Sequence, residues 1–238
     1  MSQEPKIQAL VDSLKHTTPE MQKYLRNLKR WGKDELERLD FVWHILLQSF
    51  STRGGAKGHE GLIGNQDNYC RVTFEALSGV DADKRRLVLE EVFLAAKVRY
   101  AVVKAKLMAR NYDLVAKMVG PVEATRQVLA QDGKEAKIAF MKRFYGIGPK
   151  YARNICMDAY HPDFRDTMAV DLRIKKITKS LGYSFKTFEE EERFYQDIAR
   201  EAGLQGWELD RLLYAYTDHI LADISAGEGH RNTSISRA

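Results

Sequence analysis

Residues 144–155 read Phe-Tyr-Gly-Ile-Gly-Pro-Lys-Tyr-Ala-Arg-Asn-Ile. Gly146 and Gly148 permit the backbone angles of a tight turn, because glycine has no side chain to clash. Pro149 has a fixed φ that suits the first turn of a helix. Apolar residues stand at helical spacing on both sides of the turn, at Ile138, Met141, Ala152 and Ile155. The stretch therefore predicts two amphipathic helices joined by a glycine hairpin.

The exit of this hairpin is suited to an anion. The amides around residues 147–151 point away from the turn, and a helix N-terminus carries partial positive charge. Residues 134–153 contain six Lys or Arg and one acid, and residues 97–110 contain five and no acid, in a chain whose net charge is +5. Solvated basic helix faces would explain such charge alone. Next to the hairpin it indicates a polyanionic partner, whose phosphates are contacted without reading base sequence.

Lys150 stands at the hairpin exit, and Asp171 follows 21 residues later within the sequence Ala-Val-Asp-Leu-Arg. A neutral lysine can attack a sugar carbon and form a Schiff base, after which the strand breaks by β-elimination. A carboxylate stabilises the positive charge that develops on the sugar, or activates the amine. Each residue also has a simpler interpretation: Lys150 as a phosphate contact, and Asp171 as the N-cap of a helix that begins at Leu172.

Together these residues resemble the helix-hairpin-helix (HhH-GPD) DNA glycosylases of the endonuclease III and 8-oxoguanine DNA glycosylase superfamily. The family pattern places lysine after a Gly-apolar-Gly turn, and an apolar residue followed by aspartate further along. Residues 146–150, Ala152 and residues 170–171 match it. Residues 46–52 look similar to the family helix that leads into its gap-filling loop, and the resemblance covers about residues 36–181.

The resemblance implies an all-α, two-lobed DNA glycosylase with abasic-site (AP) lyase activity, acting in base excision repair. It would extrude a damaged or modified base from double-stranded DNA into the cleft between its lobes. The implied catalytic residues are Lys150 and Asp171. The expected DNA contacts are Tyr145, Gly146, Ile147, Gly148, Arg153, Gln48 and Arg53. No organic cofactor is implied and the enzyme is expected to be a monomer, although family members often hold a monovalent cation with hairpin carbonyls, here within residues 145–150.

The chain departs from the family pattern in two respects. It has only two cysteines, Cys70 and Cys156, which excludes the four-cysteine iron–sulfur cluster of endonuclease III. The glutamine or asparagine that usually fills the gap in the duplex has three candidates, Gln48, Asn65 and Gln66, among which the sequence does not choose.

Helical periodicity runs through nearly the whole chain, without the alternation typical of strands. We expect helices at about residues 5–16, 19–31, 34–50, 66–78, 82–95, 97–111, 121–131, 134–144, 149–160, 171–181, 187–202 and 206–223. Residues 52–65 contain five glycines and no apolar period, so we expect a loop there. One lobe should span residues 36–160 and the other residues 1–35 and 161–225. The polar tail, residues 226–238, favours disorder.

Composition narrows the class of protein. The chain is 44% hydrophobic and 30% charged, which allows a core and solubility. Its first six residues lack the apolar stretch of a signal peptide, and no apolar run approaches the roughly 20 residues of a membrane helix. Two cysteines suit a reducing compartment. We therefore expect no membrane association, and a cytoplasmic, nucleoid-associated location, or a nuclear one in a eukaryote.

Two other functions are consistent with the motif residues. A helix-hairpin-helix protein that binds DNA without catalysis needs the glycines but not Asp171 at this spacing. A monofunctional glycosylase uses Asp171 with water. The excised base is left open, since an oxidised purine, an oxidised pyrimidine and a phage-type modified base all fit.

Overall fold

The computed structural model describes residues 4–52 and 56–235, and within them the chain is helical with no β-strand. The all-α prediction is thus confirmed. The chain divides into two compact units, one of Met1–Lys33 with Tyr160–Ala238, here called the terminal unit, and one of Asp34–Ala159, here called the central unit. The two places where the chain passes from one unit to the other, after Lys33 and after Ala159, are one or two residues from the expected lobe boundaries after residues 35 and 160. Over the described ranges, no helix combines the length and apolar composition needed to cross a membrane.

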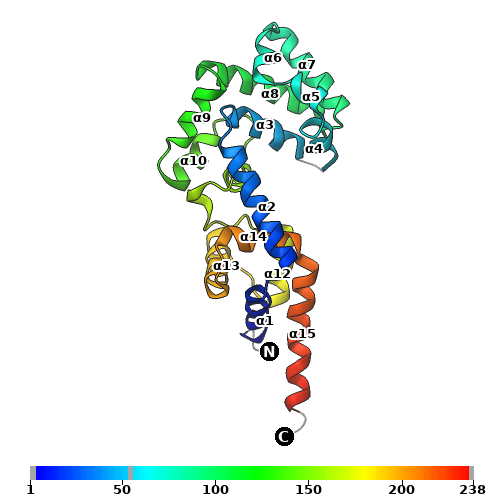
Figure 1. Ribbon diagram of the computed structural model, residues 1–238, viewed down its shortest axis with the longest axis vertical. Coiled ribbons are helices and arrows are strands. Elements are labelled where there is room, and N and C mark those ends of the chain that lie inside the picture. Colours follow the sequence, from blue (N-terminus) through cyan, green and yellow to red (C-terminus); the bar gives the residue numbers. More distant parts are fainter. Residues whose placement is uncertain (1–3, 53–55, 236–238) are drawn as a thin grey trace. The chain divides into compact units, whose positions relative to one another are not determined.

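The central unit is built around α3 (Phe41–Thr52) (Figure 1). This helix is apolar on nearly every side and buried along almost its whole length. A helix of this composition is stable only when neighbours cover it from several directions. α3 packs against α4, α8, α9 and α11. The other helices of the unit are α4 (Ala56–Leu62), α5 (Gln66–Cys70), α6 (Phe74–Ser78), α7 (Ala82–Ala95), α8 (Ala101–Lys117), α9 (Pro121–Leu129), α10 (Gly133–Met141) and α11 (Pro149–Asp158).

The terminal unit joins the two ends of the chain. α1 (Glu4–Lys15) packs against α13 (Phe188–Ala202) and α15 (Thr217–Ile235), so the earliest helix lies beside the latest (Figure 1). α12 (Leu172–Leu181) packs against α14 (Gly206–Ala215) and α15. The short 3-10 helix η1 (Pro162–Phe164) precedes α12, and α2 (Pro19–Leu36) begins in this unit and ends in the central one. Leucine and isoleucine side chains from these helices form its core.

The sequence predicts a loop at residues 52–65, but residues 56–62 of this segment form the helix α4, so the prediction is wrong there. Gly58 and Gly61 lie on this helix, where an added Cβ atom would collide with the carbonyl oxygens of Ser51 and Ala96. These glycines therefore permit close packing of α4 against its neighbours, and do not break the helix.

Other boundaries also differ from those predicted. The expected helix at 34–50 is two helices, because α2 ends at Leu36 and α3 begins at Phe41. The segment 66–78 is likewise divided into α5 and α6, since the side chain of Thr73 caps α6 by accepting from the amide of Ala76. α15 extends to Ile235, into the segment from residue 226 for which the sequence favours disorder. Once packing of Ile220 and Ile224 fixes a helix, each further residue adds one hydrogen bond at low cost.

Candidate functional site

The glycine hairpin joins α10 to α11, where the sequence predicts it. Gly146 has φ +84, a left-handed angle that glycine adopts without strain. The amide of Ile147 donates to the carbonyl of Phe144 at 3.1 Å and closes the turn. Gly148 is the N-cap of α11, and Pro149 is its first residue. Since Gly148 and Pro149 are exposed, the hairpin presents the N-terminus of α11 to solvent.

Replacing Gly146 by alanine is expected to destabilise the central unit by on the order of 2 kcal/mol or more. The added Cβ atom would lie 2.8 Å from Cζ of Phe50 and 3.2 Å from Cδ1 of Leu107, at a φ that alanine avoids. Gly148→Ala is the matched control, because φ there is −86 and no atom lies within 4 Å of the new methyl group. Chemical denaturation of both variants measures the difference, and equal stabilities would contradict this packing.

Lys150 is the second residue of α11 and its side chain is exposed. It forms no hydrogen bond or ion pair with any described residue, so its amine is available to a ligand. Tyr145 is 39% exposed, and the guanidinium carbon of Arg110 lies 3.6 Å from the centre of its ring. Arg153, one turn beyond Lys150, is half-buried. The hairpin and the first turns of α11 therefore carry an aromatic ring and two cations, and a third cation, Arg110, lies against that ring.

A pocket of about 80 Å³ lies between α3 and α11. Gln48 and Thr52 of α3, with Asn154 and Asp158 of α11, supply polar groups to its wall. Gln48 is only 8% exposed, and its Oε1 atom, like Oδ1 of Asn154, has no hydrogen-bond partner in the described structure. Buried polar atoms without partners are rare in folded proteins. Gln48 is thus placed to contact a group that enters this pocket, a position less suited to filling a gap in a duplex.

The other two candidates for the gap-filling residue, and the expected DNA contact Arg53, are placed as follows. Asn65 is the N-cap of α5 and accepts a hydrogen bond from the amide of Asn68 at 3.1 Å. Gln66 is exposed, and its side-chain amide donates to Sγ of Cys70 at 3.0 Å. Arg53 lies outside the described residues. Asn65 has a structural role as a helix cap. Gln66 is therefore the exposed candidate for the gap-filling residue that has no capping role.

Asp171, in the terminal unit, is the N-cap of α12. Its Oδ1 atom accepts from the amides of Arg173 at 2.9 Å and Ile174 at 3.0 Å. Its Oδ2 atom bonds to none of the described residues. The cap interpretation is therefore confirmed, and it leaves one carboxylate oxygen unused. Lys150 and Asp171 belong to different units, one to each.

The backbone leading into Asp171 is strained and firmly held. Val170 has φ +26, an unfavourable angle for a β-branched residue. Glu192 accepts from the amide of Met168 at 3.1 Å, and Asp210 accepts from the amide of Ala169 at 2.7 Å. Both carboxylates are buried. Strain of this kind persists only where surrounding contacts over-determine the backbone, and here they fix the position of Asp171.

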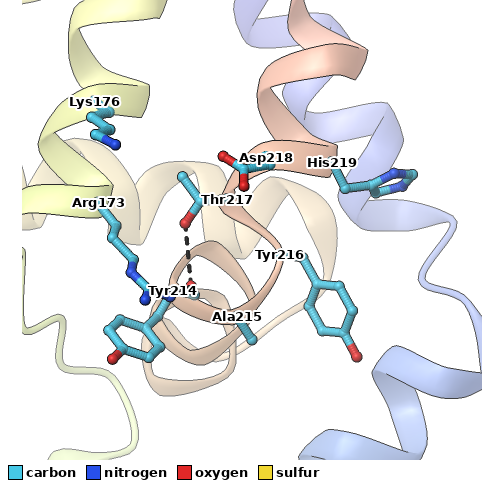
Figure 2. Close-up of a pocket in the computed structure, with 8 residues that line it drawn as sticks. All are labelled: Arg173, Lys176, Tyr214, Ala215, Tyr216, Thr217, Asp218 and His219. Carbon is cyan, nitrogen blue, oxygen red and sulfur yellow. Dashed lines mark hydrogen bonds between the residues drawn. The ribbon is translucent and has the colours of Figure 1, made fainter. Parts of the chain in front are cut away.

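A larger pocket, of about 400 Å³, opens beside α12 where α14 gives way to α15 (Figure 2). Figure 2 shows Arg173 and Lys176 extending from α12 toward the segment 214–219. Arg173 donates to the carbonyl of Tyr214 at 2.9 Å and lies 4.2 Å from the centre of its ring. Asp218 is the acidic residue of the pocket. A half-exposed tyrosine, two cations and the N-terminus of a long helix are groups that suit a nucleotide.

Two of the basic residues counted from the sequence are not available to phosphate. Lys104 is 4% exposed and donates to the carbonyl of Phe50 at 2.7 Å. Lys137 is 3% exposed and donates to the carbonyl of Gln131. α12 is a further basic helix, outside the two basic segments expected from the sequence. α12 contains no acid and has four exposed cations, Arg173, Lys175, Lys176 and Lys179.

Comparisons of this chain with protein-family models, curated proteins and solved structures find no match. Among the side chains that the structure describes, no group of three or more His, Cys, Asp and Glu is placed to hold a metal ion. Function is therefore inferred from the residues and their geometry.

Proposed function

We propose that this protein is a bifunctional DNA glycosylase of the two-lobed helix-hairpin-helix type, which excises a damaged or modified base and cleaves the resulting abasic site. The observation that carries the proposal is Lys150, an exposed lysine that bonds to no described residue and lies in the first turn of the helix that follows a glycine hairpin. Amides at this helix end hold a DNA phosphate. The amine is thereby delivered to the sugar of a bound nucleotide.

The reaction follows from the two residue types. Neutral Lys150 attacks C1′ of the extruded nucleotide through Nζ, and the bond from C1′ to the base breaks, its electron pair leaving with the base, which takes up a proton. Asp171 stabilises the positive charge on the sugar through Oδ2, while Oδ1 remains in the cap of α12. The sugar ring opens to a Schiff base, and loss of a proton from C2′ eliminates the 3′ phosphate.

The pocket beside α12 supports a nucleic-acid substrate. Tyr214 offers a ring for stacking, and Arg173 and Lys176 offer charge to a phosphate. Arg173 is held in place by its bond to the carbonyl of Tyr214, so little side-chain freedom is lost on binding.

The proposed partner is double-stranded DNA with a lesion or modified base, bound by a monomer. No organic cofactor takes part. The monovalent cation that the resemblance implies would be held by carbonyls of residues 145–150. The Tyr145 carbonyl accepts a bond from Asn111 but keeps a second lone pair. The proposed location follows from the substrate: the cytoplasm, in association with the nucleoid, or the nucleus in a eukaryote.

The capping role of Asp171 favours one alternative, a helix-hairpin-helix protein that binds DNA without catalysis. Borohydride trapping on abasic-site DNA, run beside a base-release assay, separates the candidates. The bifunctional enzyme gives a covalent adduct and free base, a monofunctional glycosylase gives free base alone, and a binding protein gives neither. A panel of lesion-containing duplexes, with oxidised purines, oxidised pyrimidines and phage-type modified bases, identifies the excised base.

DNA affinity is expected to fall steeply with salt, with a log–log slope of roughly −0.9 for each phosphate neutralised. The exposed cations of the basic segments, among them Lys106, Arg110 and Lys142, supply the contacts. Lys106→Ala should reduce the magnitude of the slope by about 0.9 if this side chain contacts one phosphate. Fluorescence anisotropy over a salt series measures both values, and a wild-type slope near zero would argue against a nucleic-acid partner.

A further inference from the structure

Asn111 is a fully buried asparagine on α8, and its side chain bonds to the hairpin. Its Oδ1 atom accepts from the amide of Tyr145 at 2.8 Å, and its Nδ2 atom donates to the carbonyl of the same residue at 3.0 Å. One side chain therefore satisfies both backbone polar groups of the residue that precedes Gly146. We call this pair of bonds the Asn111 clamp.

The same face of α8 supports the hairpin at further points. Positions 104, 107 and 111 follow helical spacing and lie on one side of a helix. Lys104 holds the carbonyl of Phe50, and the side chains of Phe50 and Leu107 pack against Gly146. The clamp is thus part of a rigid platform beneath the turn.

Burying an amide is unfavourable unless both of its ends are bonded. A leucine of similar volume would fill the same space without that requirement. Asparagine at this position therefore serves to fix a backbone conformation. A fixed conformation matters here because Gly146 leaves the turn adjustable, and backbone groups that lose a buried partner reorient toward water.

We infer that Asn111 is a positioning residue, which holds the peptide groups of Tyr145 so that the amides of Gly148 and of the first turn of α11 point at a DNA phosphate. The inference rests on the proposed function for its ligand. Asn111 itself is 0% exposed, so it acts through the hairpin and does not touch DNA.

Asn111→Leu should accelerate hydrogen exchange at the amide of Tyr145 and lower affinity for abasic-site duplex by about tenfold, since two buried bonds are lost. Hydrogen exchange followed by NMR and anisotropy titration measure the two effects on the same protein. Asn68→Ala is the matched control, because Asn68 also donates its amide to a backbone carbonyl of the central unit, that of Gly61 at 2.9 Å. It should leave exchange at Tyr145 and DNA affinity unchanged.

Asn111→Asp gives a second test that also covers poor folding of the leucine variant. An ionised aspartate still accepts from the amide of Tyr145 but repels its carbonyl, whereas a protonated aspartate can donate to that carbonyl. Burial raises the pKa of such a carboxyl group. The affinity of this variant relative to wild type should therefore recover as pH falls from about 8 to about 5.

The inference would be overturned if hydrogen exchange at the amide of Tyr145 were unchanged in Asn111→Leu. It would also be overturned if exchange in this variant were faster but its DNA affinity equalled that of wild type. The inference would also be overturned if the DNA affinity of Asn111→Asp, divided by that of wild type, did not vary with pH. If wild type binds no DNA at any salt concentration, the proposed function fails, and the positioning role fails with it. In that case exchange at Tyr145 still shows whether the clamp constrains the turn.

Discussion

Lys150→Ala is expected to give no covalent adduct when borohydride is added to its complex with abasic-site DNA. Trapping requires an amine that forms a Schiff base with the sugar, and alanine has none. The side chain of Lys150 is exposed and bonds to no described residue, so its removal should change the stability by less than about 0.5 kcal/mol. DNA affinity should fall only several-fold, because one charge is removed from a basic surface.

Lys142→Ala is the matched control for this result. Lys142 is exposed and follows α10, so its removal changes the charge near the hairpin equally without removing the proposed nucleophile. It should weaken DNA binding to a similar degree and leave trapping intact. Trapping by Lys150→Ala at the wild-type rate would exclude Lys150 as the nucleophile.

Local sequence patterns predicted where most of the helices lie, but not where one helix ends and the next begins. The expected helix at 187–202 agrees with α13, because an apolar face and a capping residue lie close together in the sequence. The expected helix at 206–223 is divided at Tyr216 into α14 and α15. Leu212, Leu213 and Ile220 are buried on both sides of that break, so the apolar period continues across it. The spacing of apolar residues therefore does not reveal a break at which a single residue departs from helical geometry.

The parts of the site that the sequence did not reveal depend on distant partners. The hairpin was predictable because two glycines and a proline specify a turn locally. Asn111 lies 34 positions from Tyr145, and an asparagine inside a helical segment carries no local signal of that bond. Lys104 looks the same in sequence as an exposed lysine, yet it is buried against the end of α3. Charge counting therefore finds a basic segment but does not distinguish its surface residues from its internal ones.

Asp171→Asn is expected to keep a near-native melting temperature and near-native lesion binding while losing almost all base release. Asparagine caps a helix about as well as aspartate, since its side-chain oxygen can accept the same bonds from Arg173 and Ile174. It carries no charge, so it cannot stabilise a positively charged sugar. Loss of such a group lowers the rate by on the order of 10² or more.

Comparison with Asp171→Ala separates the two roles of this side chain. Alanine removes both cap and charge, so it should lower the stability by about 0.5–2 kcal/mol and also abolish base release. Single-turnover excision measured beside thermal melting distinguishes the variants. If Asp171 is only a cap, the asparagine variant retains full activity and only the alanine variant is impaired. That outcome would leave the hairpin and Lys150 as a DNA-binding element, and would favour the non-catalytic alternative over the glycosylase.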